Sequence, residues 1–133
     1  SLDNYGGFTS VRFRKDVSLK GFNKIILRVL GDNKFYQLRI RSSYQDRHSY
    51  VKRFYATDDW SDIEIPLSTL EPQFRGRSLR MGNFSGNSLV ELGLLIGNKV
   101  EERFALKIDH IRLKWSSRLR FKNNIKSFVF INL

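Results

Sequence analysis

The chain has 133 residues, enough for one domain with a sizeable core, and no cysteine, so neither a disulfide nor a thiolate metal site can form. Its 24 Lys and Arg outnumber the 13 Asp and Glu, and a net charge of +11 often accompanies nucleic-acid or anionic-membrane partners, with a generic basic surface as the alternative. The sequence has no apolar run of about 18 residues, so it predicts no membrane-spanning helix.

The first third of the chain has the alternating pattern of β-strands with one buried face. Strands are predicted over residues 8–14, 24–30 and 35–41, with a connecting loop at residues 16–22. The Gly-Asp-Asn-Lys sequence at 31–34 is a strong turn signal, so the second and third strands are predicted to form a hairpin.

The middle of the chain continues the same pattern. A polar loop at 42–49 precedes a strand at 50–56, and a further strand is predicted at 60–67. Residues 68–76 suit one helical turn, and residues 77–88 are rich in Gly, Asn and Ser and indicate a loop. Short strands between turns, with no helical period, predict an antiparallel β-sandwich or barrel.

Residues 92–115 are predicted to be the central hairpin of the core. Two apolar strands flank a polar segment in which Gly97-Asn98-Lys99 supplies the turn. The inward-facing parity changes between Ile108 and Ile111, and one extra residue at Asp109-His110 would restore it. The sequence therefore predicts a β-bulge there.

The last part of the chain differs in composition from the rest. We expect residues 1–115 to form the sandwich domain and residues 116–133 to form a basic C-terminal extension. Its final apolar run, 128–131, is consistent either with one added strand or with a frayed tail.

A set of short phrases runs in order along residues 2–115. They are Asn4-Tyr5-Gly6-Gly7-Phe8-Thr9-Ser10-Val11-Arg12, Leu27-Arg28-Val29-Leu30-Gly31-Asp32, Tyr36 with Arg41, Trp60 with Ile65-Pro66-Leu67, Arg75-Gly76-Arg77, Leu92-Gly93-Leu94-Leu95-Ile96 and Phe104-Ala105-Leu106-Lys107-Ile108-Asp109-His110-Ile111. In this order and spacing the chain resembles the complex I intermediate-associated protein 30 family.

The resemblance implies a jelly-roll β-sandwich of the galactose-binding-domain-like type, related in shape to carbohydrate-binding modules. It also implies a non-catalytic role without a cofactor, since mitochondrial members assist assembly of respiratory complex I. The compartment implied is the mitochondrial matrix or the bacterial cytoplasm, with the protein soluble in either.

Two departures from the family pattern are visible. The usual upstream segment with a Met-Gly-Gly-x-Ser-like motif does not precede Leu2, and the chain continues for 18 residues beyond Trp115. One hypothesis joins them: residues 128–131 occupy a sheet edge left open by missing strands, in the same chain or in a dimer partner.

The sequence offers no catalytic constellation, so we expect no enzyme. There is no G-x-S-x-G elbow for a nucleophile, and the histidines, His48 and His110, lie in a polar loop and beside the predicted bulge. The pairs Asp58-Asp59 and Glu101-Glu102 are adjacent residues in turns, where they indicate solvated charge. For a structural calcium ion the weak candidates are Asp3, Asp32 and Asp109.

A basic sheet face is the predicted binding site. The predicted hairpin places Arg28 on one strand and Gln37, Arg39 and Arg41 on its partner, while Tyr50 and Lys52 would join the face and Trp60 would border a groove. A protein partner is the leading reading. A carbohydrate held by aromatic stacking and arginine forks is the alternative, and nucleic acid is the third.

Overall fold

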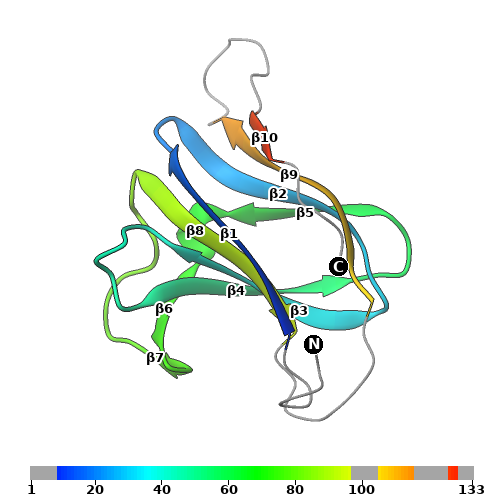
Figure 1. Cartoon of the computed structure of the whole chain (residues 1–133), viewed down its shortest axis with the longest axis horizontal. Coiled ribbons are helices and arrows are strands. Elements are labelled where there is room, and N and C mark those ends of the chain that lie inside the picture. The colour runs from blue at the N-terminus through cyan, green and yellow to red at the C-terminus, as the bar shows by residue number, and fades with distance from the viewer. Residues whose placement is uncertain (1–8, 97–104, 116–125, 129–133) are drawn as a thin grey trace.

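The computed structural model describes residues 9–96, 105–115 and 126–128. Within them, antiparallel strands form two sheets that face each other (Figure 1). The predicted all-β sandwich is confirmed. The strands are β1 (Thr9–Ser18), β2 (Phe22–Leu30), β3 (Lys34–Arg41), β4 (Ser49–Ala56), β5 (Ser61–Pro66), β6 (Glu71–Phe74), β7 (Arg77–Ser78), β8 (Ser88–Ile96), β9 (Lys107–Trp115) and β10 (Lys126–Phe128).

The larger sheet has the strand order β1-β8-β3-β4-β6-β7, and the smaller sheet has the order β10-β9-β2-β5. Alternating apolar residues of both sheets point into the space between them. Leu27 of β2, Leu38 of β3 and Ile111 of β9 are fully buried there. Consequently the residues of β3 that alternate with Leu38 and Ile40 lie on the face of the larger sheet that is turned away from the core. These residues are Gln37, Arg39 and Arg41.

The prediction of a hairpin at residues 31–34 is wrong. β2 belongs to the smaller sheet and β3 to the larger one, so the connection crosses the sandwich. Gly31 lies so close to Ala56 that a Cβ at this position would collide with it, and Asn33 has a φ of 62°. Hydrogen bonds from the Gly31 and Asn33 amides to the end of β4, of 2.7 and 2.8 Å, hold the crossing in place. The sequence does predict a turn at these residues. Local turn chemistry does not show, however, that β2 and β3 pack against each other across the core and do not pair within one sheet.

The predicted central hairpin of residues 92–115 is wrong for the same reason. β8 lies inside the larger sheet, between β1 and β3, whereas β9 pairs with β2 in the smaller sheet. The proposed turn at 97–99 and the following residues 100–104 lie outside the described residues. The bulge is confirmed: Arg28 pairs with His110 and Val29 with Ile108, which leaves Asp109 as the extra residue.

Some strand boundaries also differ from the prediction. β1 continues to Ser18, so the first half of the expected loop at 16–22 is strand. The helical turn is present as a 3-10 turn at Leu67–Thr69, but it is followed by the short strands β6 and β7, which the sequence did not reveal. These strands are too short to have a recognisable alternation.

The C-terminal extension contributes one described segment, β10, which pairs antiparallel with β9 at Lys126 to Phe128. The rest of the predicted strand, 129–131, lies outside the described residues, as does the N-terminal segment 1–8. The division of the chain at residue 115 therefore stays a prediction.

Candidate functional site

The strand order of the larger sheet brings arginines from β1 and β3 onto one face. β8 separates these strands, with Gly93 paired to both Arg12 and Arg39. In the next outward-facing row, Glu91 is paired in the same way to Arg14 and Arg41. Two guanidiniums thus flank a residue without a side chain, and two flank a carboxylate.

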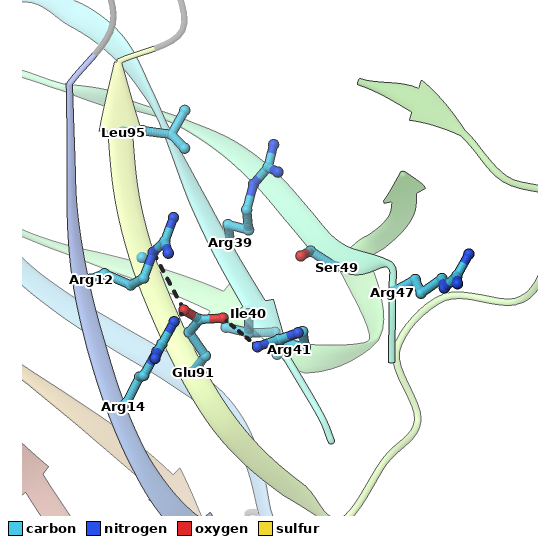
Figure 2. Close-up of a pocket in the computed structure, with 10 residues that line it drawn as sticks. Arg12, Arg14, Arg39, Ile40, Arg41, Arg47, Ser49, Glu91 and Leu95 are labelled. Carbon is cyan, nitrogen blue, oxygen red and sulfur yellow. Dashed lines mark hydrogen bonds and ion pairs between the residues drawn. The ribbon is translucent and has the colours of Figure 1, made fainter. Parts of the chain in front are cut away.

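These rows enclose a hollow of about 230 Å³, which we call the arginine hollow (Figure 2). Gly93 leaves space at its centre because it has no side chain. The hollow is lined by Arg12, Arg14, Arg39, Ile40, Arg41, Arg47, Ser49, Glu91, Gly93 and Leu95. Five arginines and a single carboxylate therefore line the hollow.

Glu91 is shared by three of the arginines. Its Oε2 lies 3.3 Å from the Nε atoms of both Arg12 and Arg14, and its Oε1 lies 3.1 Å from Arg41. Figure 2 shows the carboxylate between Arg12 and Arg14 on one side and Arg41 on the other. One negative charge cannot neutralise three, so the hollow keeps an excess of positive charge.

Arg39 stands apart from this carboxylate (Figure 2). Its guanidinium donates a 3.3 Å hydrogen bond to Gln37 Oε1, and its buried Nε has no partner among the described residues. Burial lowers the pKa of Arg39, and the nearby charge of Arg12 lowers it further. The arginine remains charged at neutral pH, so an anion entering the hollow would relieve an unfavourable interaction.

A second hollow, of about 240 Å³, lies on the same face beside β6. It is lined by Gln37, Val51, Lys52, Arg53, Glu71 and Gln73. Amide, carboxylate and cationic groups meet there, so this hollow can donate and accept hydrogen bonds.

The structure brings three of the predicted site residues together, Gln37, Arg39 and Arg41. It separates two others from them, because the expected hairpin does not exist. Arg28 lies on the smaller sheet, where it pairs with Asp62 at 3.3 Å and lies 5.9 Å from the Trp60 ring. Arg28 and Trp60 therefore do not belong to the arginine face.

Tyr50 and Lys52 also differ from the expectation. Each is paired to an inward-pointing residue of β3, Ile40 and Leu38 respectively. Tyr50 packs against the core, meets Phe84 edge to face and shares a 3.2 Å hydrogen bond with His48. Burial raises the pKa of Tyr50, and the charge of Asp46 adds to the effect. Tyr50 is therefore a packing residue, while Lys52 borders the second hollow.

The weak calcium candidates have other contacts. Asp32 accepts hydrogen bonds from the Tyr36 hydroxyl at 2.7 Å and from the Ala105 amide at 2.8 Å, which ties together two connections between the sheets. Asp109 pairs with His110 at 2.9 Å. Asp3 lies outside the described residues. Among the residues described, no group of three or more acidic, His or Cys side chains is placed to hold a metal ion.

The sequence analysis did not identify four charged residues of the hollow: Arg12, Arg14, Arg47 and Glu91. Arg12 and Arg14 do alternate with Val11 and Phe13 in a predicted strand, which indicated an outward face. The missing information was the strand order, since nothing local in the sequence places β1 and β3 on either side of β8.

The fold and this face together define a class: a β-sandwich with a basic, hollowed face on one sheet. The family model described as "Complex I intermediate-associated protein 30 (CIA30)" matches residues 1–108. The chain belongs to this family, as the resemblance implied. Within the described residues, no helix has the length and apolar character needed to cross a membrane.

Two solved structures share the fold, and both are family 11 carbohydrate-binding modules from Clostridium thermocellum. The module of the cellulosomal cellulase Lic26A-Cel5E is 15% identical with a TM-score of 0.67, over 82% of this chain and 68% of that one. The module in complex with a beta-1,3-1,4-mixed-linked tetrasaccharide is 13% identical with a TM-score of 0.53, over 80% and 83%. The search of curated proteins gave no match.

Proposed function

We propose that the protein is a non-catalytic binding module of the assembly-factor kind, and that its arginine hollow holds an acidic segment of a protein partner. One observation carries the proposal: five guanidiniums line the hollow, and the one carboxylate among them is already shared by three. Like charges this close repel one another unless an anion lies between them. Membership of a family named for an assembly intermediate favours a protein as the source of that anion.

A carbohydrate is the second candidate, supported by a different observation. The second hollow combines amide, carboxylate and guanidinium groups of the kind that hydrogen-bond sugar hydroxyls. Two of the solved structures that share this fold are carbohydrate-binding modules, one of them in complex with a tetrasaccharide. Their low identity extends only to the fold, so this candidate takes second place.

The proposal is tested by fluorescence anisotropy with a labelled glutamate-rich peptide. Arg39→Gln removes a half-buried guanidinium that has no carboxylate partner among the described residues, so the peptide should bind about 10- to 100-fold more weakly, the range expected for a charge-assisted hydrogen bond. Lys114→Gln is the charge-matched control, because Lys114 is exposed on the opposite sheet. It should change the affinity by less than about twofold, the effect of a distant, screened charge.

Equal losses in both variants would overturn the proposal, because they would mean that only net charge matters. The same assay with an unlabelled tetrasaccharide or a single-stranded oligonucleotide as competitor separates the alternatives. If the sugar displaces the labelled peptide and still does so at high salt, the ligand is a carbohydrate. If the oligonucleotide displaces the peptide and this effect falls steeply with salt, the ligand is nucleic acid.

A further inference from the structure

An exposed aromatic pair lies on the same face as the arginine hollow. Phe35 of β3 and Tyr55 of β4 are paired across the strands, and 47% and 42% of their surfaces are exposed. Their ring centroids are 5.0 Å apart with planes at 69°, and the Arg53 guanidinium lies 4.2 Å from the Phe35 ring. Two large rings held in contact at the surface form an apolar patch that is ready-made for a partner.

The aromatic pair and the hollow are joined by one strand. Phe35, Gln37 and Arg39 occupy alternate positions of β3 and so lie on the same face. The four steps along the strand from Phe35 to Arg39 span about 13 Å at the usual rise per residue. Between them lies the second hollow, to which Gln37, Arg53 and Gln73 contribute hydrogen-bonding groups.

We propose that the acidic segment of the partner binds in extended form along β3, with one apolar side chain against Phe35 and Tyr55 and a carboxylate at Arg39 four residues away. This inference rests on the proposed function and specifies its ligand. An extended peptide has the same rise per residue as the strand beneath it, so its side chains four positions apart match the two subsites. The polar groups of the second hollow would contact the peptide backbone between these two side chains.

The geometry of the rings favours a peptide over a sugar. Sugar rings and nucleobases stack on open, flat aromatic faces. Here Arg53 covers one face of Phe35, and Tyr55 stands nearly perpendicular to it. Such an arrangement makes a notch between ring edges, which accepts an aliphatic side chain or the edge of an aromatic one better than a ring stacked flat on an open face. Glu71, which lines the second hollow, would disfavour an acidic residue at the intermediate positions.

The test uses three kinds of labelled peptide on the full chain. The first is a plain peptide of Glu, Gly and Ser, and the second carries a Trp four residues before or after the central Glu. The third places the Trp three residues from it, where an extended chain points it away from the sheet. On the wild-type protein the four-residue spacing should improve affinity about 5- to 20-fold over the plain peptide, and the three-residue spacing should not.

Phe35→Thr removes one ring at an exposed position and keeps a residue suited to a strand, so folding should persist by circular dichroism. This variant should lose the gain from the Trp while binding the plain peptide as the wild type does. Three results would overturn the inference and leave the proposed function standing. They are no gain in affinity from the Trp on the wild type, a gain that persists in the Phe35→Thr variant, and an equal gain for both spacings. Failure of every peptide to bind overturns both.

Discussion

At the scale of single residues, Glu91 controls the charge of the hollow. Its carboxylate lies within 3.3 Å of three arginines, and its side chain is only 15% exposed. It therefore stabilises the cluster, but it also occupies guanidinium groups that an acidic ligand would use. The same residue should favour folding and oppose binding.

Glu91→Gln separates these two effects. The variant should bind a glutamate-rich peptide about 3- to 10-fold more tightly, because the hollow loses its own anion. It should also be less stable by about 1–2 kcal/mol in urea denaturation, a modest loss because Arg12 and Arg14 are well exposed. Weaker peptide binding in a folded variant would mean that Glu91 positions the arginines for the ligand and does not compete with it.

At the scale of elements, the outer faces of the two sheets differ in how their charged side chains are paired. On the outer face of the smaller sheet, Asp62 of β5 bonds both Arg28 of β2 and Arg112 of β9. Next to it, Glu64 pairs with Lys24 at 3.0 Å. Two carboxylates of β5 thus pair with three cations of β2 and β9, so this face offsets part of its own positive charge. The larger sheet has no equivalent arrangement among the described residues around Arg39.

The ion pairs of the smaller sheet predict a pH dependence of stability. Burial acts to raise the pKa of Asp62, but hydrogen bonds from Arg28 and Arg112 outweigh it, so the folded pKa lies below the usual 3.8. Because the folded pKa is depressed, the stabilisation is present above the unfolded pKa and disappears as the pH falls through the folded value.

Asp62→Asn tests this at constant size. At pH 7 the variant should be less stable by at most about 1 kcal/mol, since these side chains are roughly 40% exposed. The difference should shrink towards zero at an acidic pH below the folded pKa of Asp62, where the wild-type carboxylate is also protonated. Urea denaturation at both pH values measures it, with Asp58→Asn in the turn after β4 as the control. A difference that is the same at both pH values would exclude the ion pairs as its cause.

Most strands were predictable from the sequence, and their arrangement was not. Alternation identified β2, β3, β4 and β5, and the change of parity between Ile108 and Ile111 identified the bulge in β9. Turn residues at 31–34 look the same whether the chain returns in one sheet or crosses to the other. That ambiguity produced both errors of pairing.

The structure brings together the predicted site residues whose placement needed one strand alone, and separates those whose placement needed a strand pairing. Arg39 and Arg41 needed only the alternation of one strand, and they lie in the hollow. Arg28 needed the hairpin and lies on the opposite sheet. Arg12 and Glu91 needed the order of β1, β8 and β3, which arises from long-range packing of the two sheets.

At the scale of the whole molecule, we propose that the outer face of the larger sheet is the binding surface of the sandwich. The net charge of +11 alone would predict weak attraction for any polyanion over the whole surface. The outer face of the smaller sheet has two carboxylates paired with three cations, whereas the hollow of the larger sheet has one carboxylate among five arginines. This difference predicts a single preferred site for an anion. The location of the bound peptide therefore distinguishes a single site from general attraction better than the affinity does.

The most direct test is a titration of the ¹⁵N-labelled protein with the glutamate-rich peptide, followed by amide chemical shifts. The account predicts that the shifts concentrate on β1, β8, β3 and β4, with the largest changes around Gly93 and Arg39, and that Arg39→Gln suppresses them. Shifts that gather on the outer face of β2, β5 and β9, in residues 116–133, or evenly over the surface would contradict it.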